Sequence, residues 1–241
     1  MEVNFGGIIP ISTIDWYGKA AIVIFFRKCP LRCPFCQNYK LRDEDEFVDI
    51  KKIESEIEKA KDFVNAVVFS GGEPTMQFEQ IKSLADFAKR YKLFVGIETN
   101  GCYPERLREL IEKNLVDKVF LDVKAPLSDP ELYSKVIGSD GAKAVSLVRK
   151  SLEICKDRLE VRTTVFKGLI FEKEHIKAIA EELLDVTYVI QQGRPEQGPN
   201  EELKQYGMPS RDELVELARV ARKFLSHVRI RTKEFGEEVI T

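Results

Sequence analysis

Three cysteines, Cys29, Cys33 and Cys36, lie within eight consecutive residues of this 241-residue chain. Thiolates are soft ligands that suit zinc and iron–sulfur clusters, and a short loop can aim three sulfurs at one centre. A cubane cluster has four irons, so three thiolates leave one iron open to bind the amino and carboxylate groups of a substrate. Pro30 and Pro34 within the motif indicate a loop rather than a helix.

A structural zinc ion is the alternative for the same three thiolates, and it needs a fourth ligand. Neither Cys102 nor Cys155 lies in a paired motif, and the two histidines, His175 and His227, are far along the chain. We therefore expect Cys102 and Cys155 to be small core residues rather than ligands. The spacing favours an iron–sulfur cluster, and zinc stays open as the second interpretation.

A second motif, Ser70-Gly71-Gly72-Glu73-Pro74, follows the next apolar run. Glycines let backbone N–H and C=O groups approach a ligand closely, and a carboxylate accepts hydrogen bonds from an ammonium group. Taken alone, the same residues are also compatible with an ordinary turn between a strand and a helix. If both motifs end parallel strands, they lie at the same edge of the sheet, where barrel enzymes hold their active sites.

Short apolar runs alternate with amphipathic stretches, which predicts strands alternating with helices. The expected strands are residues 21–26, 65–70, 93–97, 118–123, 160–166, 188–191 and 228–231. The expected helices are residues 49–61, 78–89, 104–113, 141–155, 172–184 and 210–225. Asp49 and Ser210 are predicted N-caps. Residues 193–209, rich in Gly and Pro, are predicted to form a long loop.

About six parallel strands are fewer than the eight of a closed barrel. We therefore predict an α/β fold of the partial, open β/α barrel class, with a doubly wound sheet as the alternative. The sequence shows no repeat and no linker, so we expect a single domain over residues 1–241. Within it, residues 1–20 form an N-terminal extension and residues 193–241 a C-terminal extension.

Hydrophobic residues make up 44% of the chain and charged residues 32%, with a formal net charge of −2. This is the composition of an ordinary globular protein, and no global positive charge favours nucleic acid or an anionic membrane as a partner. The first residues lack the pattern of a signal peptide, and no early apolar run is long enough to cross a bilayer. We expect a cytoplasmic protein.

The CxxxCxxC motif after the first predicted strand, followed by GGEP after the second, resembles the signature of the radical S-adenosylmethionine (SAM) superfamily. Further segments resemble the activating enzymes of glycyl-radical enzymes, above all that of anaerobic ribonucleoside-triphosphate reductase. These segments are residues 12–19, residues 28–38, Glu98-Thr-Asn-Gly101 and Leu121-Asp-Val-Lys124. The resemblance covers roughly residues 6–192.

The resemblance implies that Cys29, Cys33 and Cys36 ligate a [4Fe–4S] cluster whose open iron binds SAM. A ferredoxin or flavodoxin would deliver one electron, and SAM would be cleaved to a 5′-deoxyadenosyl radical. That radical would abstract hydrogen from a glycine of a partner glycyl-radical enzyme. The implied chemistry belongs to the cofactors, and the protein supplies position and electrostatics.

The resemblance also implies a SAM site. Its expected residues are Phe35, Gln37, Gly71, Gly72, Glu73, Glu98, Thr99, Asn100, Asp122, Lys124, Arg162, Thr164 and Gln192. In one branch of the family, acidic groups at the positions of Glu98 and Asp122 bind a monovalent cation. Two structural interpretations stand beside these roles: Asp122 and Lys124 can form a simple ion pair, and Arg162 can balance acidic neighbours.

Two other functions remain open on the sequence. One is a radical SAM enzyme that acts on a small molecule or nucleoside, as in the formation of 7-carboxy-7-deazaguanine. The other is a non-catalytic metal-binding module. The iron-loaded protein would cleave SAM if it is a radical SAM enzyme, and it would not if it is a metal-binding module.

Overall fold

The structure is a computed structural model that describes residues 1–183 and 185–241. The chain divides into two compact units. The first comprises Met1–Pro30 and Lys40–Phe120, and the second comprises Leu31–Tyr39 and Leu121–Thr241. In the described part of the chain, no helix combines the length and the apolar character needed to span a membrane.

The strands of the first unit follow the order β3–β1–β2–β4–β5. Their bounds are β1 (Glu2–Ser12), β2 (Ala21–Phe26), β3 (Phe47–Asp49), β4 (Ala66–Gly71) and β5 (Phe94–Thr99). β2, β4 and β5 are parallel, whereas β1 is antiparallel to β2 and to β3. Because parallel strands share a direction, the ends of β2, β4 and β5 bring their following turns to one edge of the sheet.

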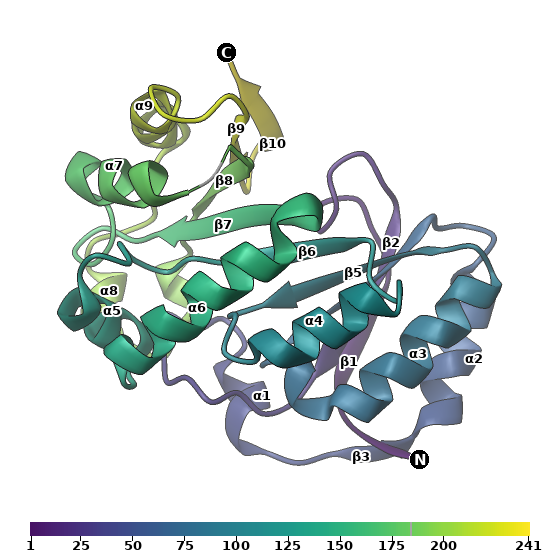
Figure 1. The fold of residues 1–241 in the computed structure, drawn as a ribbon. Coiled ribbons are helices and arrows are strands. Elements are labelled where there is room, and N and C mark those ends of the chain that lie inside the picture. Colours follow the sequence, from purple (N-terminus) through teal and green to yellow (C-terminus); the bar gives the residue numbers. More distant parts are fainter. Residues whose placement is uncertain (184) are drawn as a thin grey trace. The chain divides into compact units, whose positions relative to one another are not determined.

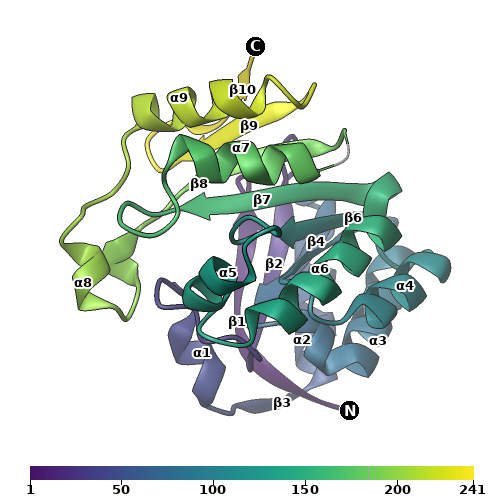
Figure 2. The same ribbon diagram turned by 60° about the vertical axis from the view of Figure 1, so that its left-hand side comes forward.

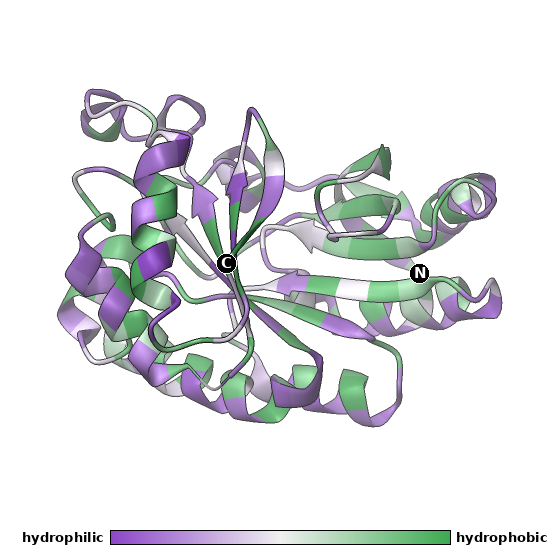
Figure 3. Ribbon diagram, turned by 90° about the horizontal axis from the view of Figure 1, so that it is seen from above, coloured by the Kyte–Doolittle hydropathy of each residue, from purple (hydrophilic) through white to green (hydrophobic). Residues whose placement is uncertain are grey.

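The helices of the first unit are α1 (Tyr39–Asp43), α2 (Ile50–Ala60), the 3-10 helix η1 (Pro74–Gln77), α3 (Phe78–Arg90) and α4 (Pro104–Glu112). The first residue of α1, Tyr39, belongs to the second unit. The longer helices α2, α3 and α4 each bury one apolar face, whereas α1 buries no residue. Figure 1 shows α2, α3 and α4 side by side. Asp49 caps α2 by accepting a hydrogen bond from the Lys51 backbone N–H at 2.9 Å. Figure 3 shows hydrophobic and hydrophilic colours alternating along the helices, as expected for amphipathic helices.

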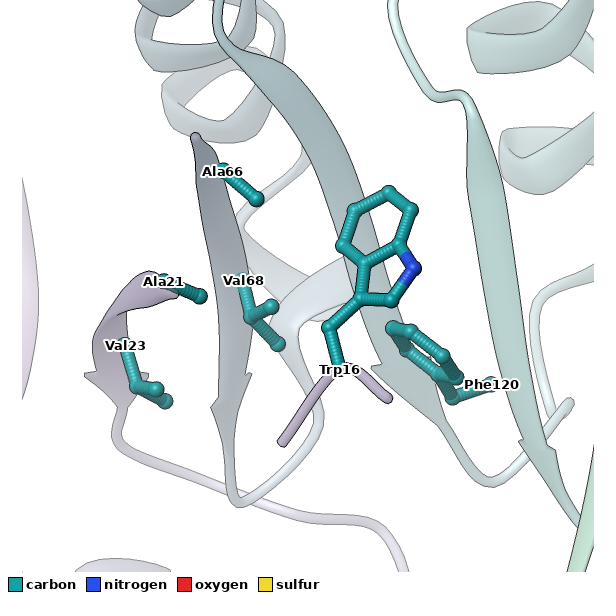
Figure 4. Close-up of a cluster of buried hydrophobic side chains, with 6 residues drawn as sticks. All are labelled: Trp16, Ala21, Val23, Ala66, Val68 and Phe120. Carbon is teal, nitrogen blue, oxygen red and sulfur yellow. The ribbon is translucent and has the colours of Figure 1, made fainter. Parts of the chain in front are cut away.

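Trp16 is central to the hydrophobic core on one face of the first unit's strands. It packs edge-to-face on Phe120, with ring centroids 5.4 Å apart (Figure 4). The small side chains that complete this cluster are Ala21, Val23, Ala66 and Val68. A Cβ atom on Gly96 would lie 2.8 Å from Phe120 Cε2 and 3.0 Å from Trp16 Cζ3. Glycine at position 96 therefore leaves the space that the two rings fill.

The second unit has strands in the order β7–β8–β9–β10, of which β7, β8 and β9 are parallel and β10 returns antiparallel to β9. Their bounds are β7 (Leu159–Val165), β8 (Thr187–Gln192), β9 (Val228–Thr232) and β10 (Gly236–Ile240). β6 (Lys118–Asp122) spans the division between the units.

The helices of this unit are α5 (Pro130–Ile137), α6 (Gly141–Cys155), α7 (Lys173–Glu182), α8 (Glu201–Lys204) and α9 (Arg211–Ala221). Two 3-10 helices, η2 (Lys156–Arg158) and η3 (Pro195–Gln197), complete the unit. α7 and α9 lie side by side, and α9 packs on β8 and β9 (Figure 2).

The predicted alternation of strands and helices is confirmed, and α6 has the predicted bounds. Ser210 caps α9 in a reciprocal capping box with Glu213. Several elements were not expected from the sequence, among them β1, β3, β10, α1 and α5. The prediction of a long loop over residues 193–209 is corrected by two short helices within it, η3 and α8. The predicted end of one helix, residue 184, lies outside the described residues.

Candidate active site

The glycine turn at the end of β4 is held by the backbone that follows β2. Gly72 N–H donates to the Phe26 carbonyl and Glu73 N–H donates to the Lys28 carbonyl, both at 2.8 Å. A Cβ atom on Gly71 would lie 2.3 Å from Phe26 O, and one on Gly72 would lie 2.1 Å from Lys28 O. The two glycines thus permit a close backbone approach, which fixes the turn beside the segment that leads into Cys29.

Glu73 is fully buried in the first unit. Its carboxylate accepts hydrogen bonds from the backbone N–H and hydroxyl of Thr75, from the Thr99 hydroxyl at 2.9 Å and from the Asn100 N–H at 2.8 Å. Burial raises the pKa of Glu73, and these donors oppose the rise by stabilising the carboxylate. Glu73 therefore fixes the turn after β5 to the turn after β4.

Asn100 connects this turn to the first cysteine. Its Nδ2 lies 3.6 Å from Cys29 Sγ, within hydrogen-bond range for sulfur, and its Oδ1 accepts from the Cys102 N–H at 3.0 Å. Cys102 is half-buried. Glu98, which precedes the turn, accepts a hydrogen bond from the Ser70 hydroxyl at 2.5 Å. The amide of Asn100 is thus placed to orient Cys29.

The cysteine loop belongs, from Leu31 onward, to the second unit. Cys36 N–H donates to the Cys33 carbonyl at 3.2 Å, and Arg32 N–H donates to the Ile137 carbonyl at the end of α5 at 2.8 Å. Gly138 follows with φ +61°, and a Cβ atom there would lie 2.4 Å from Arg32 O. The end of α5 therefore supports the loop that carries Cys33 and Cys36.

Phe35 is a buried aromatic side chain of this loop, and Gln37 is exposed on it. The Phe35 ring stacks on Phe166 with centroids 4.5 Å apart. A Cβ atom on Gly198 would lie 3.1 Å from Phe35 Cα, so the glycine-rich segment after β8 packs directly on the loop. These contacts fix the conformation of the loop between its two cysteines.

The three cysteines of the motif are thiols and are not joined by disulfides. Cys33 is buried, and this burial raises the pKa of its thiol to about 11. Among the residues that the structure describes, no three His, Cys, Asp or Glu side chains are grouped closely enough to hold a metal ion. The assignment of the three thiols to one metal centre therefore depends on their spacing in the sequence. Cys155 is a buried core residue, as expected.

A hollow of about 170 Å³ in the second unit is lined by Phe35, Asp122, Lys124, Arg162 and Thr164. All five were expected to bind the cofactor.

Charged groups in the hollow are paired with each other or with a neighbour. Lys124 Nζ lies 2.7 Å from Asp122 Oδ2. Burial lowers the pKa of Lys124, but the charge and hydrogen bond of Asp122, together with Cys33 and Tyr133, raise it overall, so the cation persists. Arg162 Nε lies 2.9 Å from Glu160 Oε1, and both side chains are almost fully buried. Both ion-pair interpretations of the sequence are thus observed, in residues that also line the hollow.

Gln192 does not line the hollow. Its side chain is buried, where Nε2 donates to the Pro209 carbonyl at 2.7 Å and Oε1 accepts from the Lys233 N–H at 2.7 Å. It joins the segment before α9 to the β9–β10 hairpin. Thr164, in contrast, lines the hollow and donates to Gln191 Oε1 at 3.2 Å.

Sequence reasoning missed several residues that support these groups. They are Glu160, Gly138, Phe166 and Gly198. Only Gly138 carried a local signal, because a glycine that directly follows an amphipathic stretch is a common helix C-cap. The other three act on residues distant in the sequence, and local patterns do not reveal such contacts.

The family described as the Radical SAM superfamily matches residues 23–186. This chain belongs to the radical SAM superfamily. It is a radical SAM enzyme, and the cofactors of its family are a [4Fe–4S] cluster and SAM. The residues present fit these groups, because the three thiols are soft iron ligands and the hollow offers both a cation and a carboxylate to an amino acid.

Comparisons with individual proteins agree with this assignment. A Methanocaldococcus jannaschii protein, provisionally named a glycyl-radical enzyme activating enzyme, is 36% identical over 96% of this chain and 97% of its own length. The 7-carboxy-7-deazaguanine synthase of the same organism is 28% identical over 71% of this chain and 73% of its own.

A solved structure shows the same fold. The radical SAM methyltransferase from Sphaerobacter thermophilus matches with a TM-score of 0.70 and 13% identity, over 90% of this chain and 67% of that one. The predicted α/β fold of the open, partial β/α barrel class is thereby confirmed.

Proposed function

We propose that this radical SAM enzyme generates a glycyl radical on a partner protein. The observation that carries the proposal is the similarity to the Methanocaldococcus jannaschii protein, which extends over nearly the whole of both chains. The motifs at Glu98–Gly101 and Leu121–Lys124 also resemble those of activating enzymes. Anaerobic ribonucleotide reductase is the favoured partner, and a ferredoxin or flavodoxin is the favoured electron donor.

The cofactors, when bound, supply a 5′-deoxyadenosyl radical that takes a hydrogen atom from the substrate. Cys29, Cys33 and Cys36 ligate the cluster in this proposal. Asn100 supports the ligand role of Cys29 through its amide, which lies 3.6 Å from the sulfur. The end of α5 supports Cys33 and Cys36 through the contact of Gly138 with Arg32.

The hollow holds one end of SAM in this proposal. Lys124 and Arg162 present positive charges to a carboxylate, and Asp122 presents a carboxylate to an ammonium group. The Phe35 ring contributes an apolar wall and excludes water. The backbone of Gly71 and Gly72 binds the methionine amine, while Glu73 fixes the position of this turn through Thr99 and Asn100.

Three further residues take outer positions in the proposed SAM site. Gln37 is exposed on the cysteine loop, next to the third ligand. Glu98 is fixed by Ser70 and is the proposed acidic group of a monovalent cation site. Gln192 supports the site through the hairpin that it holds.

The test is electron paramagnetic resonance on a mixture of the iron-loaded enzyme, SAM, a chemical reductant and an anaerobic ribonucleotide reductase from the same source. We expect a doublet from a glycyl radical that grows with time and requires SAM. Replacement of the reductase glycine by alanine is the control for the site of the radical. Release of 5′-deoxyadenosine without a doublet would contradict the activase proposal while leaving radical SAM activity intact.

A second candidate function is supported by the similarity to 7-carboxy-7-deazaguanine synthase. It predicts that the enzyme forms 7-carboxy-7-deazaguanine without a protein partner. Chromatography of small-molecule products separates the two functions, because the activase leaves only 5′-deoxyadenosine and methionine.

A further inference from the structure

A chain of buried ion pairs leads from the hollow to the C-terminal hairpin of the second unit. Arg162, which lines the hollow, pairs with Glu160 at 2.9 Å. Glu160 also pairs with Arg229 at 3.0 Å. Arg229 pairs with Glu237, which pairs in turn with Arg231 at 2.7 Å. We call these five residues the charge ladder.

The strand register explains why residues so distant in sequence meet. Glu160 and Arg162 lie two apart on β7, and Arg229 and Arg231 lie two apart on β9, so each pair shares one face of the sheet. Arg162 lies beside Val189 of β8, and Val189 lies beside Arg229 of β9. Arg229 therefore reaches across β8 to the carboxylate of Glu160, which Arg162 contacts from the same strand.

The ladder is shielded from water along its length. The side chains of Glu160 and Glu237 are 2% and 5% exposed, and those of Arg229 and Arg231 are 13% and 14% exposed. In such surroundings, neutralising Glu237 weakens one ion pair of Arg229 and leaves its pair with Glu160 as the stronger attraction. The Arg229 guanidinium then shifts toward Glu160, the carboxylate that it shares with Arg162. A change at Glu237 therefore reaches Arg162 through Arg229 and Glu160.

We propose that Glu237 is a positioning residue, which holds the Arg162 guanidinium in the hollow through Arg229 and Glu160. The C-terminal hairpin thereby sets the affinity of the site for the carboxylate end of its ligand. This inference rests on the proposed role of Arg162 in binding SAM. It does not depend on which substrate receives the radical.

The neighbouring residue Glu238 provides a matched control. It lies on the same strand and pairs with Arg211 at 2.7 Å, outside the ladder. Its side chain is 28% exposed. Glu237→Gln and Glu238→Gln each remove one negative charge from neighbouring positions. Only the first substitution removes it from the charge ladder.

The first measurement uses the protein without iron, so that it is independent of activity. In nitrogen-15 correlation spectra, the Arg162 Nε–H signal is assigned by its loss in Arg162→Lys. We expect Glu237→Gln to shift or broaden this signal and Glu238→Gln to leave it unchanged. Arg229→Lys is the second ladder variant, and it applies the same test if Glu237→Gln does not fold.

The second measurement is the dissociation constant of SAM for the iron-loaded protein. We expect this dissociation constant to rise about tenfold in Glu237→Gln and to stay unchanged in Glu238→Gln. A tenfold rise is at the low end of the effects that follow the loss of an outer supporting contact. A role limited to stability would lower the melting temperature of both variants and leave SAM affinity equal.

An unchanged Arg162 signal in both ladder variants would overturn the inference. A shifted signal with unchanged SAM affinity would also overturn it, while the glycyl-radical test of the proposed function would still stand. If Arg162→Lys itself binds SAM normally, the assignment of Arg162 to the SAM site fails, and the inference fails with it.

Discussion

The carboxylate of Glu73 accepts hydrogen bonds from Thr75, Thr99 and the Asn100 backbone inside the first unit. From the sequence, the same carboxylate was a candidate partner for an ammonium group. Its burial and its donors also make it a support for two turns. The sequence indicated that Glu73 matters, but its four donors come from residues up to 27 positions away, and no local pattern encodes them.

Replacing Glu73 by glutamine tests this structural role. The substituted NH₂ group would face donors that need an acceptor, so we expect the free energy of unfolding to fall by about 2 kcal/mol. Urea unfolding followed by circular dichroism measures the change. Glu105→Gln, in an exposed pair with Arg108, should change it by less than about 1 kcal/mol. Equal effects of the two substitutions would show that the buried bonds of Glu73 add nothing.

Cys155 gives a prediction on pH. Burial raises the pKa of this thiol to about 12 from 9.0, so the folded state retains its proton where the unfolded state loses it. The stability from Cys155 is therefore complete below pH 9 and is lost as the pH rises toward 12. Between these values we expect the free energy of unfolding to fall more steeply than in Cys155→Ala, by at most about 1.4 kcal/mol per pH unit. Parallel pH profiles of the two proteins would contradict this.

At the scale of elements, α5 supports the cysteine loop, and it was not predicted. Its sequence, Pro130–Ile137, is short, and Asp129 and Gly138 provide its N-cap and C-cap. Tertiary contact with Arg32 gives this helix its role, and that contact joins segments about 100 residues apart. The longer helix α6, Gly141–Cys155, was predicted with its bounds.

Gly138→Ala tests the support that α5 gives to the loop. The added Cβ would lie 2.4 Å from the Arg32 carbonyl, so the loop must move. We expect iron uptake in anaerobic reconstitution to fall at least severalfold. Gly207→Ala is the matched control, because Gly207 also has a left-handed backbone, with φ +68°, and nothing lies within 4 Å of its added Cβ. Both variants carry the cost of left-handed alanine, of order 1 kcal/mol, but only Gly138→Ala should lose iron. Equal iron contents would contradict the support.

β1 was also not predicted from the sequence, for a different reason. Gly6, Gly7 and Pro10 interrupt the apolar alternation on which strand prediction depends. The strand forms because it pairs with β2, with register shifts near Gly7 and after Ile9 that accommodate these residues. Residues 1–20 thus contain a strand of the sheet.

At the scale of the whole molecule, substitution of Trp16 tests how much the core around this residue stabilises the first unit. Trp16→Ala should lower the free energy of unfolding by about 3 to 5 kcal/mol, since the indole fills the space above Gly96 and against Phe120. Thermal or urea unfolding measures it. Phe63→Ala, at an exposed phenylalanine, should cost less than about 1 kcal/mol. A loss below 1 kcal/mol for Trp16→Ala would show that this core is not tightly packed.

The family and its cofactors could be predicted from the sequence, because the cysteine motif and the glycine turn are short and local. The charge ladder could not, because its members come from β7, β9 and β10 and meet only through the register of the sheet. The same limit applies to the contacts of Phe35 with Phe166 and Gly198. These supports depend on packing between distant segments.

The central claim is that Cys29, Cys33 and Cys36 hold the cluster through which this enzyme cleaves SAM. Its most direct test is the 5′-deoxyadenosine released when a chemical reductant and SAM are added to the anaerobically reconstituted protein. We predict release by the native protein and by Cys155→Ala, and none above background by Cys33→Ala, with the lost iron measured in the same samples. Cleavage of SAM by Cys33→Ala at the native rate would contradict the claim.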